Sequence, residues 1–321
     1  MAEDPLVSIL LLTYNQERFV REAIQSALYQ TYKPLEVILS DDCSTDRTFE
    51  IIEEEASVYS GPHKIIINRN LKNIGLAGNL NRAWELSSGQ LIVAHAGDDV
   101  SVPWRVEKLV RRWQKQVPPV DLVCSYFEEI DVEGNPTGFI KKEVTYFPDT
   151  SQNVIKWRCG ATGACAAYSR KLYEKYGHLD TRVYQEDQVY SFRAWIESGI
   201  AVVEEPLVKH RTHDASITVM GRNVKKIRDA AQRRISRRKG DENTLAIAEE
   251  WLRAWQIRGG DENQKNIESA LRHLVRLRQL KLLAHDATRV EAFKIAVLLL
   301  LNRGNIVDVE RILVRHVMRW E

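Results

Sequence analysis

Cysteine pairs and long apolar runs are both scarce in this 321-residue chain. The four cysteines form no CxxC pair, so we expect no disulfide scaffold and no zinc site, but reduced thiols in a cytoplasmic protein. The longest apolar run, 295–301, is far shorter than the roughly 20 residues of a membrane-spanning helix. Two acidic residues precede the first apolar run, unlike the basic start of a signal peptide. We therefore expect neither secretion nor membrane insertion, while a peripheral position on the inner face of the cell membrane stays open.

Two nucleotide-binding fingerprints are also missing. The chain contains no GxGxxG segment and no GxxxxGK followed by Ser or Thr. The first binds dinucleotides and the second cradles the phosphates of nucleoside triphosphates. Their absence argues against a hydride-transfer enzyme and against a P-loop kinase.

The two charge signs nearly balance over the whole chain but not along it. The sequence has 46 Lys and Arg against 44 Asp and Glu, a net charge of +2. Residues 1–219 carry 24 basic and 31 acidic side chains, a net of −7, whereas residues 220–321 carry 22 and 13, a net of +9. With 44% hydrophobic residues the chain can bury a substantial core. The charge break predicts two parts of different character.

The first 120 residues alternate short apolar runs with longer segments of helical periodicity. Continuous apolar runs are typical of strands buried on both faces, and helices between them cover such a sheet. We therefore predict an α/β fold of Rossmann-like type, with a mostly parallel central sheet and helices on both faces. The predicted strands are 7–12, 35–40, 64–67 and 91–94, and the predicted helices are 18–30, 47–59, 78–87 and 106–116.

The pattern changes twice further along the chain. Residues 120–216 mix both element types, with predicted strands 121–127, 165–168 and 201–204 and predicted helices 170–176 and 188–197. Beyond residue 217 only helical patterns occur, at 220–239, 244–257, 263–283, 289–301 and 307–317. This change coincides with the charge break, so we predict an α/β domain over 1–218 and an all-helical domain over 219–321.

Polar residues follow the predicted parallel strands at the points where they end. These are Thr13, Tyr14, Asn15 and Glu17, then Asp42, then Gly75 and Asn79, then Asp98 and Asp99. Ligands of open α/β sheets bind beyond the carboxyl ends of the strands, so we expect these groups to share one crevice. Adjacent carboxylates suit a hard divalent cation with free positions for phosphate oxygens. Taken singly, such acids are equally typical of turns and helix caps.

The sequence resembles the inverting family 2 glycosyltransferases of GT-A fold, of the type that builds bacterial surface polysaccharides such as lipopolysaccharide or O-antigen. The resemblance covers most of residues 6–216, in the family's order and spacing. The segments that carry it are VSILLLTYNQERFVREAIQSALYQTY, LEVILSDDCSTDRT, NIGLAGNLNRAWELSSGQLIVAHAGDD, CGATGACAAYSRKLYEKYGHLD, EDQVYSFRAWIESG and KHRTHDAS.

The resemblance assigns the strand-end residues to a nucleotide-sugar donor and a metal ion. It implies a base pocket floored by Thr13, Tyr14, Asn15 and Glu17, with Asp42 hydrogen-bonded to the base and Gly75 and Asn79 alongside. It places Asp98 near the ribose and Asp99 on a divalent cation, Mn²⁺ or Mg²⁺, with His213 as an additional ligand. Many members have another Asp two residues before the pair, where this chain has Ala96.

The resemblance also implies the residues of sugar transfer. Asp187 matches the Asp of the family's Glu-Asp motif, the general base that takes the proton of the acceptor hydroxyl. Glu186 then orients the acceptor, and Gly163 and Arg211 line the sugar or acceptor pocket. A Glu-Asp pair at a helix start is otherwise typical of dipole compensation.

The predicted helical domain begins with a strongly basic segment. Nine Lys or Arg and a single acid lie between Arg222 and Lys239, around a narrow apolar stripe. Residues 220–239 can bind an anionic membrane surface, where a lipid-linked acceptor would lie, or can pack their stripe within the protein. The remaining helices can pack together or form a homo-oligomer contact. Nucleic acid is an unlikely partner, because aromatic residues do not interleave with the basic ones.

The sequence as a whole predicts a metal-dependent inverting glycosyltransferase, of hexosyltransferase type. It would move a sugar, from a UDP-sugar by preference, to a hydroxyl of a glycan or lipid-linked glycan. Two alternatives remain: a sugar nucleotidyltransferase, and a non-catalytic module that binds a nucleotide sugar or a membrane. The first should have a glycine-rich and basic loop after the first strand, where this chain has TYNQER.

Overall fold

The structure is a computed structural model, and it describes residues 4–142, 161–214, 216, 229–259, 265–285, 291, 295 and 297–298. The chain divides into two compact units. One comprises Met1–Phe147 and Arg158–Val219, and the other Pro148–Trp157 and Met220–Glu321. In the second half of the chain the first unit ends at Val219, one residue after the end of the α/β domain predicted from charge and pattern.

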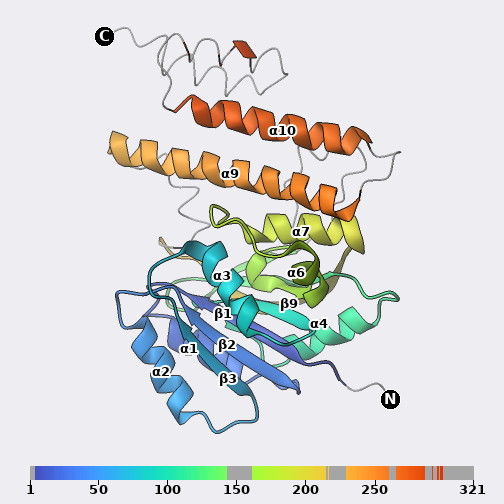
Figure 1. The fold of residues 1–321 in the computed structure, drawn as a ribbon. Coiled ribbons are helices and arrows are strands. Elements are labelled where there is room, and N and C mark those ends of the chain that lie inside the picture. The colour runs from blue at the N-terminus through green and yellow to red at the C-terminus, as the bar shows by residue number, and fades with distance from the viewer. Residues whose placement is uncertain are drawn as a thin grey trace. The chain divides into compact units, whose positions relative to one another are not determined.

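A nine-stranded mixed sheet forms the core of the first unit (Figure 1). Its strands follow the order β3-β2-β1-β4-β8-β6-β9-β5, and β7 pairs with β6 outside this path. Strands β3, β2, β1 and β4 run parallel to one another, whereas β8 is antiparallel to both β4 and β6. The strands are β1 Val7–Thr13, β2 Leu35–Asp41, β3 Lys64–Arg69, β4 Leu91–Ala96, β5 Val100–Ser101, β6 Leu122–Ile130, β7 Pro136–Lys141, β8 Ala166–Ser169 and β9 Ile200–Arg211.

Helices cover both faces of this sheet, which confirms the predicted fold class. Alternate residues of β1, such as Val7 and Ile9, enter a core cluster with residues of α1, α2 and α4, while α3 packs on the other face of β1 and β2. The helices are α1 Val20–Leu28, α2 Thr48–Val58, α3 Gly75–Leu86, α4 Arg105–Gln114, α6 Arg170–Tyr176 and α7 Glu186–Glu197, with a short 3₁₀ turn, η1, at Gly163–Cys165.

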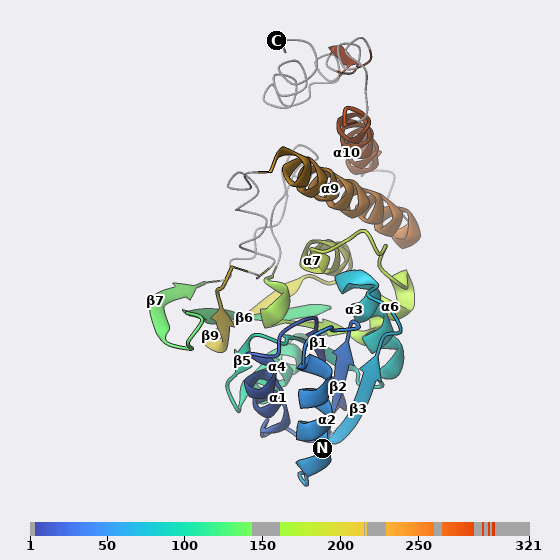
Figure 2. The same cartoon turned by 90° about the vertical axis from the view of Figure 1, so that its left-hand side faces the viewer.

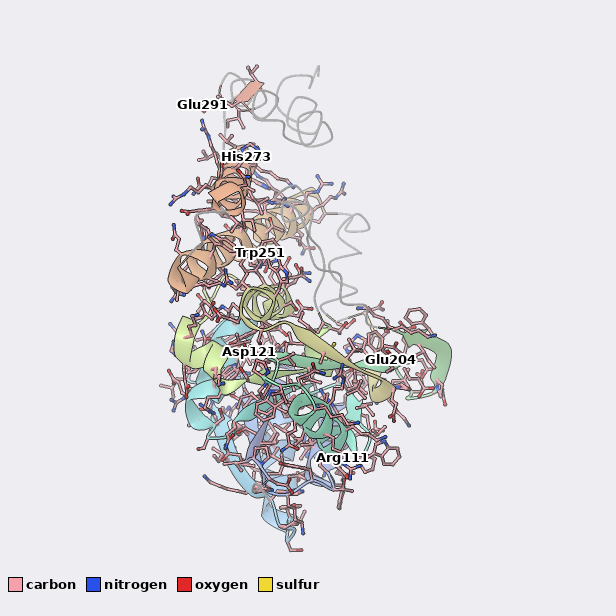
Figure 3. All side chains as sticks on the ribbon, turned by 90° about the vertical axis from the view of Figure 1, so that its right-hand side faces the viewer. Arg111, Asp121, Glu204, Trp251, His273 and Glu291 are labelled. Carbon is pink, nitrogen blue, oxygen red and sulfur yellow. The ribbon has the colours of Figure 1, made fainter. Side chains whose placement is uncertain are left out.

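The parallel register brings the polar strand ends to one edge. Thr13 of β1 lies opposite Asp41 of β2, and Leu12 lies opposite Ala96 of β4. Asp98 and Asp99 follow β4 directly, so the loops after three strands open at the same edge. Asp121, labelled in Figure 3, lies at the amino end of β6 and accepts a hydrogen bond of 2.5 Å from the Ser198 hydroxyl. The strand-end residues that were predicted to bind the donor and a metal ion therefore gather where the carboxyl ends of β1, β2 and β4 meet.

The boundaries of α3 and β9 differ from the sequence expectation, and two strands were not predicted. Helix α3 begins at Gly75 rather than residue 78, because the Asp42 carboxylate caps its amino end. Strand β9 extends to Arg211 rather than ending at residue 204, because its pairing with β6 continues through two register shifts. The strands β5 and β7 were not predicted, since β5 has only two residues and β7 is almost wholly exposed and carries no continuous apolar run.

The helical unit contains two long helices in its described part, seen in Figure 2. Helix α9 spans Ala230–Arg258 and packs on α10, Lys265–Leu283. Asp241 of α9 bonds Lys281 Nζ at 3.0 Å and His285 Nε2 at 2.8 Å. The predicted helices 220–239 and 244–257 are continuous across Gly240 in α9, although 220–228 lie outside the described residues. Most of the predicted helix 289–301 and all of 307–317 also lie outside them. None of the helices in the described ranges combines the length and apolar character needed to cross a membrane.

The aromatic packing of α3 predicts a large loss of stability for one substitution. Trp84 is fully buried and stacks on Tyr173 of α6 and Tyr190 of α7, with ring centroids 5.0 and 5.9 Å away. Trp84→Ala removes this packing and leaves a cavity, so we expect the free energy of unfolding to fall by about 3–5 kcal/mol. Urea denaturation measures this, with Tyr29→Ala as the control, because Tyr29 is 70% exposed. A loss below about 1 kcal/mol would contradict the packing described.

Candidate functional site

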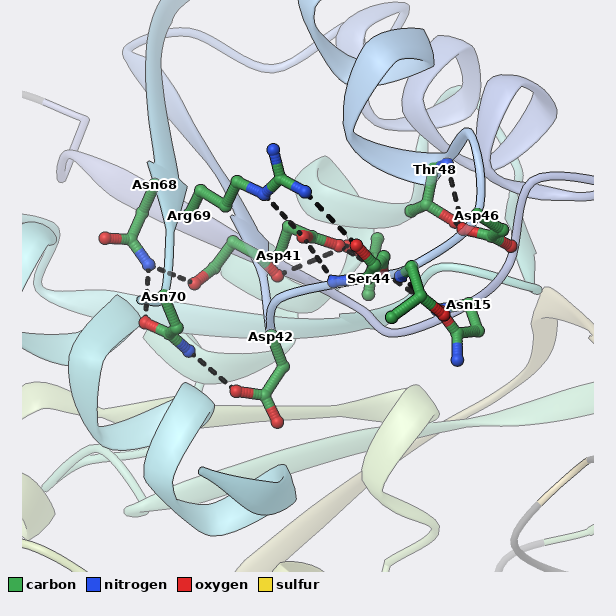
Figure 4. Close-up of polar contacts among 12 residues, drawn as sticks. Asn15, Asp41, Asp42, Ser44, Asp46, Thr48, Asn68, Arg69 and Asn70 are labelled. Atoms are coloured by element: carbon green, nitrogen blue, oxygen red, sulfur yellow. Dashed lines mark hydrogen bonds and ion pairs between the residues drawn. The ribbon is translucent and has the colours of Figure 1, made fainter. Parts of the chain in front are cut away.

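The loop after β1 is tied to the loop after β2 by backbone and side-chain hydrogen bonds (Figure 4). Asn15 has a positive φ of 51°, its N–H donates to Ser44 Oγ at 2.9 Å, and its Oδ1 accepts from Thr45 N at 2.8 Å. Glu17 Oε2 accepts from Arg47 N at 3.0 Å. Asn15 and Glu17 therefore fix the shape of the predicted base pocket. Tyr14, which is 47% exposed, offers the aromatic surface on this loop.

The two adjacent acids after β2 have different partners, and both carboxylates are buried. Asp41 accepts from Thr13 Oγ1 at 3.1 Å and from Ser44 N at 2.9 Å. Asp42 accepts from the backbone N–H groups of Ile74 and Gly75 at 2.9 and 2.8 Å. Thr13 is thus bound to Asp41, and Asp42 holds the amino end of α3.

Gly75 and Asn79 also take part in this capping arrangement. Gly75 has a φ of 80°, in the left-handed region that favours glycine, and its N–H donates to Asp42 at the start of α3. Asn79 is buried, donating to Ser40 O at 2.9 Å and accepting from Asn70 at 3.0 Å. Asn70 in turn donates to Asp42 at 2.9 Å. The nucleotide contacts predicted for Asp42, Gly75 and Asn79 stay predictions, and the structure gives these residues a supporting role.

Beyond β4, the structure brings Asp98 and His213 together. Asp98 Oδ2 and His213 Nε2 are 3.0 Å apart, and each side chain is 13% exposed. The His213 ring also packs on Phe19, with ring centroids 4.8 Å apart. A carboxylate and an imidazole thus lie side by side, each held in place and each with part of its surface open to solvent.

Asp99 lies behind this pair and is fully enclosed. Its carboxylate contacts His210 Nδ1 at 3.0 Å and accepts from Arg211 N at 2.8 Å. Burial raises the pKa of Asp99, against the opposing charge of His210. Asp99 in turn raises the pKa of His210 above its ordinary value, although burial acts in the opposite direction. Of the two acids, Asp98 and not Asp99 therefore presents a carboxylate that a ligand can reach, which differs from the roles implied by the resemblance.

Arg211 bonds several segments around the site, and the prediction that it lines the sugar or acceptor pocket stays a prediction. Its Nε donates to Asp98 O at 3.0 Å, its Nη1 to Val132 O at 3.2 Å, and its Nη2 to Glu22 Oε2 at 2.6 Å. All three nitrogens are occupied and the side chain is buried. Arg211 thus ties the turn after β4 to the β6–β7 turn and to α1.

The side chains that could coordinate a metal ion show whether a divalent cation fits this site. No cluster of three or more His, Cys, Asp or Glu side chains suited to a metal ion occurs among the described residues. Asp98 and His213 supply one oxygen and one nitrogen donor within 3.0 Å of each other. Mg²⁺ is commonly held by one or two carboxylates plus substrate phosphates, and Mn²⁺ accepts oxygen and imidazole ligands. The pair therefore fits a cation whose coordination is completed by phosphate oxygens of a bound nucleotide.

The Glu186-Asp187 pair begins α7 and lies against η1. A Cβ added to Gly163 would overlap Glu186 Oε1, so glycine at this position allows the carboxylate to approach the backbone. Asp187 Oδ1 accepts from Gln188 N at 2.8 Å. Burial, and then the charge of Asp187, raise the pKa of Glu186 to about 8. Glu186 therefore carries a proton near neutral pH, while Gly163 serves as the close-packed neighbour of the acidic pair.

Three supporting residues had no clear signal in the sequence. Phe19 packs on His213, His210 binds Asp99, and Arg105 bonds three segments around the site. Phe19 belongs to a helical pattern that predicts a core or surface position, Arg105 immediately precedes the predicted helix 106–116, and His210 lies three residues before His213 with no pattern that indicates its partner. Only their long-range partners, 111 residues away for His210 and Asp99, show what they support.

Sequence comparison places the chain in a known family. A sequence model of Glycosyl transferase family 2 matches residues 8–177, more than half of the chain, and the protein belongs to this family. The putative glycosyltransferase EpsE of Bacillus subtilis is 42% identical over 138 residues, which cover 42% of this chain and 48% of EpsE. The putative glycosyltransferase EpsH of the same organism is 28% identical over 227 residues, covering 67% of this chain and 63% of EpsH. The chain thus matches about half to two thirds of the length of these relatives.

Solved structures share the fold at low sequence identity. S. aureus TarS 1–349 in complex with UDP-GlcNAc has a TM-score of 0.54 at 17% identity, covering 95% of this chain and 88% of TarS. The mannosyltransferase PcManGT of Pyrobaculum calidifontis, in complex with GDP-Man and Mn²⁺, has a TM-score of 0.50 at 18% identity and covers 88% of each chain. These likenesses establish the fold.

The raised pKa of Glu186 predicts how stability depends on pH. Between the ordinary value of 4.5 and about 8, the folded chain holds a proton that the unfolded chain has released. The stabilisation is therefore complete below pH 4.5 and is lost as the pH rises towards 8. We expect the free energy of unfolding to decline over this range, and to decline less in Glu186→Gln.

Urea denaturation at several pH values between 5 and 8 measures this difference. Glu174→Gln is the matched control, because Glu174 is an exposed glutamate on α6. Its pH dependence should follow that of the wild type. Equal slopes for Glu186→Gln and the wild type would show that Glu186 ionises normally in the folded chain.

Proposed function

We propose that the protein is a metal-dependent inverting glycosyltransferase that uses a nucleotide-sugar donor. The observation that carries the proposal is the Asp98–His213 pair at the carboxyl edge of a family 2 sheet, where a phosphate-bound cation fits. The acidic pair at the start of α7 supplies the second requirement, a base for the acceptor. Family membership supports the class of reaction, and the two sites support its mechanism.

The donor nucleotide would bind the loops after β1 and β2. Tyr14 offers a flat surface for the base, and the loop from Asp42 to Thr48 is held by Asn15 and Glu17. Asp42 keeps lone pairs beyond its three hydrogen bonds, so it can still accept from an imide N–H. That chemistry favours uracil, in keeping with the UDP and UDP-GlcNAc complexes of TarS, whereas PcManGT is seen with GDP-Man.

Asp98 and His213 would hold the divalent cation, Mn²⁺ or Mg²⁺. When bound, the cation supplies positive charge that stabilises the negative charge developing on the departing nucleoside diphosphate. Phe19 and Arg211 keep the two ligands in place, the first through the His213 ring and the second through the backbone of Asp98. Asp99 secures the same turn from behind through His210 and Arg211 N.

Asp187 would act as the general base. It takes the proton of the acceptor hydroxyl while the oxygen forms a bond to the anomeric carbon and the bond from that carbon to the diphosphate oxygen breaks. Attack from the face opposite the diphosphate inverts the configuration without a covalent intermediate. Glu186, protonated near neutral pH, can donate a hydrogen bond that orients the acceptor, so the two neighbouring carboxyl groups have different tasks.

The acceptor is proposed as a hydroxyl of a glycan or a lipid-linked glycan in the synthesis of a cell-surface polysaccharide. The likeness to EpsE and TarS supports this class. The basic first part of α9, with exposed Arg237, Arg238 and Lys239, supports a peripheral contact with an anionic membrane. A homo-oligomer contact through the rest of the helical unit is a separate part of the proposal. A sugar nucleotidyltransferase and a non-catalytic binding module are the alternatives that experiment must separate.

The variant Asp187→Asn tests the general base, and the wild type in the same assay tests the proposed sugar transfer. The wild type is incubated with Mn²⁺ and a panel of UDP-, GDP- and dTDP-sugars, and release of the nucleoside diphosphate is measured with and without glycan acceptors. For Asp187→Asn we expect the rate to fall by about 10²- to 10⁴-fold, because the base is lost while the shape is kept. UDP affinity, measured by calorimetry, should stay within about twofold, since Asp187 lies on α7 and not in the nucleotide loops.

The matched control is Glu204→Gln, which neutralises an exposed carboxylate on β9 (Figure 3). It should turn over donor like the wild type. Unchanged turnover in Asp187→Asn would reject Asp187 as the base. Donor binding without any turnover in the wild type would instead favour a non-catalytic module, and release of pyrophosphate from a nucleoside triphosphate and a sugar phosphate would favour a nucleotidyltransferase.

A second prediction concerns the cation. With UDP present, saturating Mn²⁺ should stabilise the wild type, by about 2.7 kcal/mol at 100 times its dissociation constant. Asp98→Asn and His213→Gln should lose most of this gain, because each removes one of two protein ligands. Thermal unfolding with and without Mn²⁺ measures it, and His178→Gln is the control, since His178 is exposed and pairs with Glu85. Full Mn²⁺ stabilisation in both variants would place the cation elsewhere.

A further inference from the structure

Arg105, the first residue of α4, is a buried cation at the centre of the site's framework. Its side chain is almost fully enclosed, with 1% of the residue exposed. Its Nη1 donates to Ser101 Oγ at 2.9 Å, and its Nη2 donates to Ala94 O at 2.9 Å and to Ala164 O at 2.7 Å. A single guanidinium thus joins β4, β5 and η1.

The partners of this guanidinium are all neutral. No carboxylate among the described residues lies within ion-pair distance of Arg105, and Asp99 acts on it only at longer range. Burial lowers the pKa of Arg105 to about 10, which leaves the group charged at neutral pH. An enclosed charge without a direct counter-ion is costly, so the bonds that it makes have to offset that cost. A neutral core residue would stabilise the fold without the cost of burying a charge. The presence of Arg105 therefore points to a role beyond stability.

The three segments that Arg105 joins carry the two halves of the site. Strand β4 leads, two residues after Ala96, to Asp98, which pairs with His213. Turn η1 begins with Gly163, the residue that lies against the Glu186 carboxylate. Because one nitrogen, Nη2, bonds both Ala94 O and Ala164 O, it fixes the distance between these backbones directly.

We propose that Arg105 is a positioning residue that sets the spacing between the Asp98–His213 pair and the Glu186-Asp187 pair. The inference rests on the proposed function, in which the first pair holds the donor's diphosphate through a cation and the second deprotonates the acceptor. A planar guanidinium can donate hydrogen bonds to three acceptors at fixed angles, whereas a lysine ammonium on a flexible side chain cannot hold the same three acceptors. Displacements of about 1 Å between reacting groups can cost roughly 100-fold in rate.

The test compares Arg105→Lys with a matched control on the same helix. Arg112 is also an arginine of α4 that bonds a backbone carbonyl, Val202 O at 3.0 Å, but it contacts neither β4 nor η1. Steady-state release of nucleoside diphosphate is measured with the nucleotide sugar that the wild type turns over, together with UDP affinity by calorimetry. For Arg105→Lys we expect kcat to fall by roughly 10- to 100-fold with KM and UDP affinity within about twofold, and for Arg112→Lys no comparable change.

Amide hydrogen exchange supplies a readout that does not depend on turnover. Exchange at residues 161–166 should accelerate in Arg105→Lys relative to Arg112→Lys, while exchange in β1 and β2 stays unchanged. If Arg105→Lys fails to fold, Ser101→Ala removes one of the three acceptors of the Arg105 guanidinium and should lower kcat by a smaller factor.

Three results would overturn the inference. These are a kcat equal to that of Arg112→Lys, an equal loss of kcat and UDP affinity, and unchanged exchange at residues 161–166. The first two would assign Arg105 to general stability or to no role in the reaction. A wild type without turnover would refute the proposed function instead, and the exchange comparison would still decide whether Arg105 holds η1.

Discussion

The parallel register of β1 with β2 and β4 is the constraint on which the site depends. It sets Thr13 opposite Asp41 and Leu12 opposite Ala96, so the loops that follow these strands must begin at the same edge of the sheet. A shift of one residue would turn the buried side chains of β1 to the opposite face and separate the loops. The burial of the continuous apolar runs therefore fixes the position of the polar residues that follow them.

Most of the polar groups at this edge hold the loops of the site in place, and of these we propose a ligand contact only for Asp42. Asp41, Asp42 and Asp99 are buried, and each accepts backbone N–H groups that would otherwise lack a partner. Such groups are costly to bury alone and favourable when fully bonded, so they hold their loops in one conformation. Tyr14, which is exposed, and Asp98 and His213, which are partly exposed, rest on this buried layer.

The sequence predicted the elements well where burial is two-sided and periodicity is clear. Strands β1, β2 and β4 and helices α1, α2 and α4 lie within a few residues of their predicted ranges. It could not predict β5 or the full length of β9, because those segments are paired by distant partners and not by their own apolar pattern. The sequence identified the acids of the site but not their different roles, since Asp98 and Asp99 are neighbours in sequence and differ only in the residues that enclose them.

That difference shows why a motif of two adjacent acids does not by itself define a metal site. In the turn after β4 the two carboxylates contact different histidines, Asp98 contacting His213 and Asp99 contacting His210. Both histidines come from the end of β9 and the residues just after it, so the pairing of β9 with β5 and β6 decides which acid is enclosed. The distinction between a carboxylate that can bind a ligand and a structural one therefore depends on β9, a strand more than 100 residues away, and the local sequence around the two acids does not reveal it.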